Sequence, residues 1–155
     1  MRMTLSTLLD AVQAKIAEAI PEAEHYRGRM EEGFSRPAFL YIPIYQGEKK
    51  TNFVTSKRDI EVQIIYFGKM DGYGREDMKD RLRVQDVLDG FLNQFYLEAG
   101  ERRLHFTYEI KETDGKLTYY LTFTFYDEAF DRRMLADEAR EEAESVEVKT
   151  KVTGA

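Results

Sequence analysis

Residues 104–126 have the sequence LHFTYEIKETDGKLTYYLTFTFY, which is the strongest local signal for the fold. On both sides of the Asp114–Gly115 pair, apolar or aromatic side chains alternate with mostly polar ones. Alternate side chains of a strand point to opposite faces of a sheet, and Asp-Gly is a preferred two-residue hairpin turn. The stretch therefore predicts an antiparallel β-hairpin with one apolar and one largely polar face.

Two amphipathic helices are predicted upstream of this hairpin. Residues 4–19 carry apolar side chains at helical spacing, with Thr4 or Ser6 as the cap and Pro21 preventing continuation. Residues 75–98 form the second helix, and Gly100 is a suitable residue just past its end. Its interior glycine, Gly90, points to close packing. The second helix is expected to present these side chains to the core: Met78, Leu82, Leu88, Leu92 and Phe95, flanked by Val84, Val87 and Phe91.

Between the helices, a short segment around His25–Met30 is followed by two longer predicted strands. They span Ala38–Tyr45 and Asp59–Phe67, and Pro43 indicates that the first of them lies at an edge or contains a bulge. Gln46–Arg58 is polar and basic, which is typical of either a long loop or the tip of an extended hairpin. Gly68–Gly74 is a glycine-containing connection to the second helix.

The order of elements is helix, three short or medium strands, helix, hairpin and a charged C-terminal tail. It predicts an α+β fold with a mostly antiparallel sheet and two amphipathic helices packed on one face. Residues 1–135 are expected to form a single domain. Residues 136–155 are expected to form a charged tail that contains a short helix and depends on a partner for its order.

Composition limits the functional classes. The chain has 155 residues, no cysteine and a formal net charge of −6, with a pI near 5.1. The absence of cysteine excludes disulfides and thiolate chemistry, and the acidity disfavours duplex-DNA binding. No apolar run approaches the about 20 residues that span a bilayer, and residues 1–4 do not lead into a signal-peptide core, so a cytosolic origin without membrane contact is expected.

Motifs that carry chemistry are weak in this sequence. His25 and His105 have no convergent carboxylates in the pattern, which favours solvated histidines over a catalytic or metal site. Gly68–Gly74 lacks the Lys-Ser/Thr pair of a phosphate-binding loop. The acidic side chains of the second helix indicate a solubilising outer face; they are Asp77, Asp80, Asp86 and Asp89. We therefore expect no catalytic residue, no cofactor and no metal ion.

A signature opens the first long strand. Gly33-Phe34 is followed by Pro37 and Phe39, and the next strand ends in the Tyr66–Phe67 pair. Gly33 permits a turn with positive φ, and Pro37 fixes φ where the strand begins, so the signature is expected to hold the fold. With the order of elements over residues 4–135, this segment resembles the tail terminator proteins of prophages and phage-tail-like particles.

The resemblance implies a function. Such a protein is a structural virion component, not an enzyme, that forms a ring, commonly a homohexamer, on the finished tail tube. It stops tube growth and joins the tail to the neck at the head-proximal end of the virion tail, after assembly in the host cytoplasm. The implied partners are further copies of itself, the tail tube protein and the sheath and neck proteins, with DNA only passing through the lumen.

Two surfaces are expected to make the subunit contacts. The first is the basic tip, with Lys49, Lys50, Lys57 and Arg58; the second is the polar hairpin face, with Thr118, Tyr120, Thr122 and Thr124. Tyrosine suits an interface because it joins a large apolar body to a polar end. The sequence leaves alternatives open. The tip could be a single-stranded nucleic-acid surface or a solvated loop, and the protein could be a head–tail connector or a small-molecule enzyme or binding module.

Overall fold

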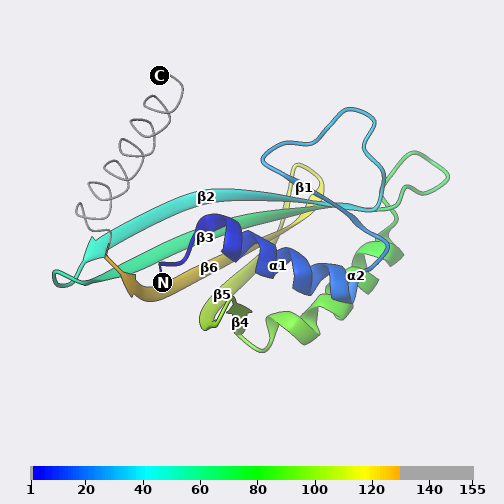
Figure 1. The fold of residues 1–155 in the computed structure, drawn as a ribbon. Coiled ribbons are helices and arrows are strands. Elements are labelled where there is room, and N and C mark those ends of the chain that lie inside the picture. The colour runs from blue at the N-terminus through cyan, green and yellow to red at the C-terminus, as the bar shows by residue number, and fades with distance from the viewer. Residues whose placement is uncertain (1, 130–155) are drawn as a thin grey trace, which may run out of the picture.

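The computed structural model describes residues 2–129 as a curled six-stranded sheet with two helices on one of its faces (Figure 1). The sheet has the strand order β1-β2-β3-β6-β5-β4, and only β1 and β2 run parallel. The predicted α+β class is therefore confirmed. In chain order the elements are α1 (Leu5–Ala19), β1 (Glu24–Arg27), β2 (Ala38–Lys50), β3 (Thr55–Phe67), α2 (Met78–Leu92), β4 (Tyr96–Ala99), β5 (Arg102–Thr113) and β6 (Lys116–Glu128).

The predicted C-terminal hairpin is confirmed as β5 and β6. Thr113 pairs with Lys116, and the two residues between them, Asp114 and Gly115, both have positive φ, at 52° and 75°. This is the geometry that asparagine, aspartate and glycine favour in a two-residue hairpin turn. Most of the strand residues that the alternation assigned to the apolar face, including Tyr119, are buried, whereas Tyr108 and Ile110 are half-buried.

The first helix is also confirmed. Thr4 precedes α1 with extended backbone angles, and its hydroxyl accepts a hydrogen bond from the Thr7 amide at 3.1 Å. The cap satisfies one of the amides that has no partner within the helix. The buried stripe of α1 consists of Leu8, Leu9, Val12 and Ile16.

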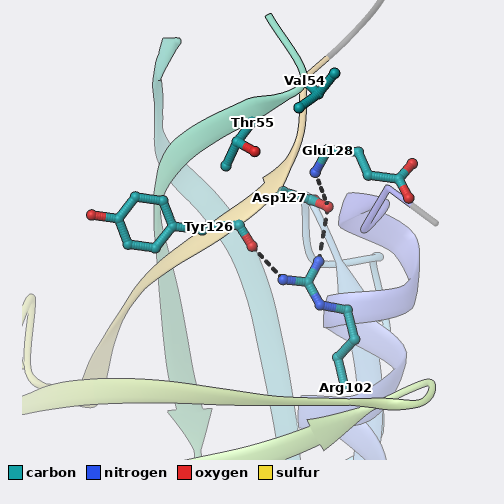
Figure 2. Close-up of a pocket in the computed structure, with 6 residues that line it drawn as sticks. All are labelled: Val54, Thr55, Arg102, Tyr126, Asp127 and Glu128. Atoms are coloured by element: carbon teal, nitrogen blue, oxygen red, sulfur yellow. Dashed lines mark hydrogen bonds and ion pairs between the residues drawn. The ribbon is translucent and has the colours of Figure 1, made fainter. Parts of the chain in front are cut away.

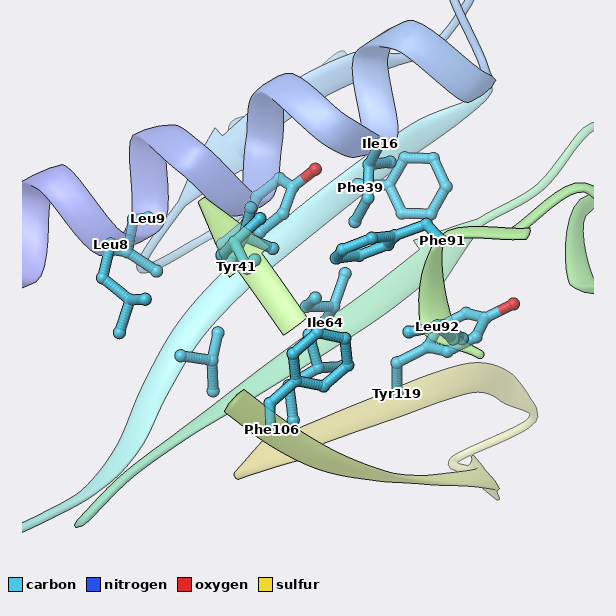
Figure 3. Packing of buried hydrophobic residues seen from close by; sticks show 14 of the residues in the cluster. Leu8, Leu9, Ile16, Phe39, Tyr41, Ile64, Phe91, Leu92, Phe106 and Tyr119 are labelled. Carbon is cyan, nitrogen blue, oxygen red and sulfur yellow. The ribbon is translucent and has the colours of Figure 1, made fainter. Parts of the chain in front are cut away.

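A single apolar core lies between the two helices and one face of the sheet (Figure 3). The register places Phe39 opposite Tyr66 and Ile64 opposite Tyr119, so their side chains lie on the same face. All four are at most 1% exposed. Burial of each large side chain contributes about 1.5–3 kcal/mol, so this layer is the main source of stability. From the helices the core takes Leu8, Leu9, Val12, Ile16, Val84, Leu88, Phe91 and Leu92.

The end of the second helix was predicted wrongly. α2 ends at Leu92 with Asn93 as its cap, Phe95 has a φ of 57°, and β4 follows. The chain reverses there because β4 pairs with β5, placing Leu97 opposite Leu104 in the core. Gly100 lies in the β4–β5 turn with a φ of 62°, and is not the residue that ends the helix.

The buried face of α2 also differs from the prediction. Leu88 and Leu92 are buried as expected, but Met78 is 58% exposed and Leu82 53% exposed. The stripe that faces the sheet instead contains Asp80, Val84, Leu88 and Phe91, because tertiary packing outweighs the apolar count on the other side. The remaining exposed members of the predicted set are Val87 and Phe95. Gly90 has no atom within 4 Å of an added Cβ, so it does not mark close packing.

The central hairpin is longer than predicted. β2 and β3 pair from Ala38 opposite Phe67 to Lys50 opposite Ser56, so the extended-hairpin alternative for residues 46–58 is the right one. The register shifts between Pro43 and Tyr45, which confirms the expected bulge. β1 covers β2 only as far as Tyr41, so Pro43 lies where β2 has a free edge among the described residues. The predicted tail helix lies outside residues 2–129.

Candidate interaction surfaces

The distal half of the β2–β3 hairpin, residues 46–58, projects beyond the helices, and we call it the arm (Figure 1). Asn52 organises its turn, since the side-chain oxygen accepts hydrogen bonds from the Val54 and Thr55 amides at 2.9 Å each. Phe53 at the turn is 92% exposed and Val54 is 72% exposed. A large aromatic residue at the end of a rigid hairpin is a feature of contact surfaces more than of solvated turns.

Three lysines make the arm basic. Lys49 lies directly opposite Lys57, and Lys50 lies opposite Ser56 with its ammonium 5.9 Å from the centre of the Phe53 ring. Like charges at directly opposed positions destabilise a sheet. None of the three lysines forms a salt bridge with a side chain in the described range, residues 2–129. The arm therefore carries a positive charge that its own strands do not balance.

Arg58, which the sequence placed in the same basic group, is buried at 7% exposure. Its Nη1 donates to Oδ2 of Asp127 at 2.8 Å and to the Met3 carbonyl at 2.6 Å. Arg102 donates to Oδ1 of Asp127 at 2.8 Å and to the Tyr126 carbonyl (Figure 2). We call these groups the Asp127 cluster. It joins the N-terminus, β3, β5 and β6 at the base of the arm, so Arg58 has a structural role there.

The charge state of Asp127 follows from this cluster. Burial opposes ionisation of the carboxyl, but the Met3 amide and Arg58 both donate to the carboxylate. The Glu128 amide and Arg102 add to the same effect. Together they hold the pKa of Asp127 below its ordinary value. Both residues continue the core-facing alternation of their strands, Arg58 with Ile60 and Asp127 with Phe125, which is the sequence signal that identifies them.

A shallow pocket lies beside this cluster, where the described chain ends. Val54 and Thr55 line one side and Tyr126, Asp127 and Glu128 the other, with Arg102 below (Figure 2). The amide of Ala129 donates to the Val54 carbonyl at 2.9 Å. Ala129, the last described residue, therefore lies next to the turn of the arm.

The sheet face that no described helix covers contains the second predicted surface. Tyr120 is half-buried and its hydroxyl lies 3.3 Å from Gln63 Nε2 and 3.1 Å from Thr113 Oγ1. Thr124 is exposed and donates to Asp59 at 2.8 Å. Among the remaining two, Thr122 is half-buried and Thr118 is fully buried at 0% exposure. Thr118 is thus not available for contact in this chain, whereas the other three form a polar surface.

The predicted signature residues anchor one loop to the end of β3. Gly33 has a φ of +68°, and Phe34 packs edge-on against Phe67 at 5.2 Å between ring centres. The Arg36–Pro37 peptide is cis, and Phe39 is fully buried. The expected turn at Gly33 is confirmed. Phe34, however, packs on the face opposite the helices.

Arg36, between these signature residues, was missed by sequence reasoning. Its guanidinium lies 5.8 Å from the centre of the Phe67 ring and donates to Gly68 O at 3.0 Å. Glu76 accepts from Arg36 at 3.2 Å and from Lys116 at 2.9 Å. These contacts close the end of the sheet at which Thr118 is buried.

Asp80 is not on a solubilising face, contrary to the prediction. It is 6% exposed and accepts a hydrogen bond from the Tyr66 hydroxyl at 2.5 Å. Burial raises the pKa of Asp80, but the bonds from Tyr66, the Lys69 amide and Arg83 outweigh it and lower the pKa overall. Burial, together with the bond to Asp80, raises the pKa of Tyr66. The spacing of Asp80 with Val84 and Leu88 was the signal for its buried position.

The two histidines lie on different strands, His25 on β1 and His105 on β5. His25 is half-buried, stacks on Phe39 at 6.0 Å and lies 2.9 Å from the Tyr41 hydroxyl through Nδ1. Burial lowers its pKa. His105 is exposed on β5. Within residues 2–129 no group of three or more His, Asp or Glu side chains is arranged to hold a metal ion. No described helix is long and apolar enough to cross a membrane.

Comparisons with known proteins bear on this geometry. The family model described as phage tail terminator protein matches residues 7–133. One solved structure is similar over 83% of this chain and 98% of its own, with 12% sequence identity and a TM-score of 0.42. A search of curated protein sequences found no match. The family match covers nearly the whole domain, including β1 to β6 and both helices. The chain therefore belongs to the phage tail terminator family, whose members are structural, tail-capping components of the virion and not enzymes.

Proposed function

We propose that this protein forms a closed ring of identical subunits, a homohexamer, on the head-proximal end of the tail tube. The ring stops tube polymerisation and joins the tail to the neck. The observation that carries the proposal is the combination of the family match with an arm whose exposed tip and unbalanced lysines project from the domain.

The two sides of the sheet support a cyclic arrangement. A ring interface is heterologous, which means that it joins two different surfaces of the same chain. At one edge, the outer side of β2 has no strand partner beyond Tyr41 within the described residues, and this edge carries the basic arm. At the other edge, the outer side of β5 has no strand partner beyond His105 within the same range, and there Glu109 and Glu112 are exposed. Edges with unpaired backbone groups and different charges can meet in a head-to-tail contact.

The subunit contacts in this proposal use the arm and the uncovered sheet face. From the arm we assign Lys49, Lys50 and Lys57, with Phe53 as an aromatic anchor. From the uncovered face we assign Tyr120, Thr122 and Thr124. Arg58 and Thr118 are left out because both are buried within the subunit.

The proposed partners are the tail tube below the ring and the sheath and neck proteins around and above it. DNA passes through the centre without specific contacts. The formal charge of −6 per chain supports this role, because like-charge repulsion limits the binding of a phosphate polymer.

Electron microscopy of the full chain mixed with purified tail tubes tests the ring. We expect class averages with six-fold symmetry at one end of each tube, and tubes that no longer elongate when tube protein is added. Rings of another symmetry would correct the stoichiometry. Tubes that elongate equally with and without the protein would contradict the capping role.

A further inference from the structure

The part of the chain beyond Arg133 has a charge opposite to that of the arm. Residues 137–147, DEAREEAESVE, contain six acidic residues and one arginine. The arm presents Lys49, Lys50 and Lys57 without a carboxylate partner in the described range. Lys49 and Lys57 also face one another across the hairpin, where an anion placed between them would relieve their repulsion.

The last described residue, Ala129, lies close to the basic arm. Lys57 lies opposite Tyr126, three residues before Ala129, which corresponds to about 10 Å along a strand. Seven residues lie between Ala129 and Asp137, and the eight Cα–Cα steps that join them reach up to about 28 Å. Because the Ala129 amide is bonded to Val54, the described chain ends at the turn of the arm, within reach of a tether of this length.

We propose that residues 137–147 bind the basic side of the arm of their own chain, over Lys49, Lys57 and the exposed ring of Tyr126. A short tether gives the segment an effective concentration in the millimolar range, which favours the same chain over another copy in dilute solution. This inference rests on the proposed function in one respect: the covered residues include those assigned to the subunit contact. The acidic segment therefore competes with a neighbouring subunit and holds back assembly in the absence of a tube.

Paramagnetic relaxation measures the contact directly. The native chain has no cysteine, so Ser145→Cys accepts a single nitroxide label. In a dilute ¹⁵N-labelled full chain, we expect the amide signals of residues 49–57 to lose at least half of their intensity, and those of β4 to keep theirs. In a mixture of nitroxide-labelled ¹⁴N chain with ¹⁵N chain that carries no nitroxide, the arm signals of the ¹⁵N chain should show no such loss. Loss in the mixture alone, or no loss at the arm, would overturn the inference.

Charge variants give the second readout. A fourfold variant removes acidic charge from the segment: Glu138→Gln, Glu141→Gln, Glu142→Gln and Glu144→Gln. It should abolish the broadening and lower the concentration at which rings form about threefold. A threefold change is expected if the segment covers the arm in two-thirds of the molecules, because only the remaining third can then bind a neighbouring subunit. A matched control removes four exposed carboxylates of α1, β1 and the loop after it: Glu18→Gln, Glu24→Gln, Glu31→Gln and Glu32→Gln. The control should change neither quantity.

The two proposals fail separately in this design. If the protein forms no ring under any condition, the relaxation data still report whether the segment contacts the arm. If the fourfold tail variant and the control shift the assembly concentration equally, the shift is an effect of net charge and the competition is contradicted.

Discussion

The two halves of the β2–β3 hairpin belong to the same pair of strands but differ in nearly every physical respect. In the proximal half, Phe39 faces Tyr66 and Tyr41 faces Ile64, all at most 1% exposed beneath the helices. In the distal half, Lys49 faces Lys57, and the turn exposes 92% of Phe53. The register is continuous apart from the bulge at Pro43, so both halves have the same antiparallel backbone pairing.

The proximal half of the hairpin stabilises the fold, whereas the distal half presents a surface for interaction. Apolar area removed from water in the proximal half stabilises the fold, whereas the arm adds little buried area and displays charge and one aromatic ring. The Asp127 cluster lies at the boundary and fixes the base of the arm to the N-terminus and β5. Substitutions in the two halves should therefore separate unfolding from assembly.

The largest effect is expected at the boundary. Asp127→Asn removes the carboxylate that balances buried Arg58, and loss of one partner of a buried ion pair costs about 3–5 kcal/mol. Urea unfolding followed by circular dichroism should show this loss of unfolding free energy. Asp114→Asn, in the exposed β5–β6 turn, is the matched control and should stay within about 0.5 kcal/mol of the native chain. Equal effects of the two changes would mean that the Asp127 cluster does not hold the fold.

The core of the proximal half comes next. Ile64→Ala leaves a cavity beneath the helices and should lower the unfolding free energy by about 2–5 kcal/mol. Val54→Ala removes an apolar group from the 72% exposed position in the arm and should change it by no more than about 0.5 kcal/mol. Denaturant titrations of both variants compare the two halves directly. A cost for Val54→Ala as large as that for Ile64→Ala would remove the distinction between them.

Acidic pH is expected to lower the free energy of unfolding by protonating two buried carboxylates, one of them at the boundary. The pKa values of Asp127 and Asp80 lie below their ordinary value of 3.8, so the folded state binds fewer protons than the unfolded state there. Their contribution is fully present above about pH 5 and decreases as the pH falls through about 4 and below. Unfolding free energies measured from pH 7 to pH 3 should follow this curve. Asp127→Asn should make the unfolding free energy depend less on pH. An unchanged pH dependence in that variant would mean that groups other than Asp127 cause the acid sensitivity.

The smallest effect on stability, with the largest on assembly, is expected in the arm. Lys49→Glu with Lys50→Glu changes exposed side chains and should alter the unfolding free energy by about 0.5 kcal/mol or less. Ring formation on tubes, scored by electron microscopy, should be lost. Lys15→Glu with Lys79→Glu makes the same charge change at exposed positions of the two helices, away from the arm, and should leave rings intact. Normal rings from the Lys49/Lys50 variant would exclude the arm from the subunit contact.

Sequence reasoning predicted the elements whose periodicity is strong. The β5–β6 hairpin and α1 were predicted closely because alternation, an Asp-Gly turn and a capping threonine agree with the packing. The end of α2 was not, since the Asn93–Phe95 break depends on β4 pairing with β5, a contact that local propensity does not encode. Met78 is exposed because the stripe of α2 that contains Asp80, Val84 and Leu88 packs against the sheet instead.

The candidate surfaces were predicted less completely than the fold. Lys49 and Lys57 do lie on an exposed hairpin, but Arg58 between Lys57 and the core points inward to Asp127. A residue-type count groups the four cations, whereas strand parity separates Lys49 and Lys57 from Arg58, because Arg58 shares a face with Ile60. Thr118 is buried for a tertiary reason, namely the closure of that end of the sheet around Phe67.

The length distribution of tails is the most direct measure of the central claim that this protein ends tube growth. Particles assembled without the protein, imaged by electron microscopy, should have tubes of widely scattered length with no joined neck, and expression of the intact chain should restore one uniform length. Tubes of normal, uniform length in its absence would contradict the account.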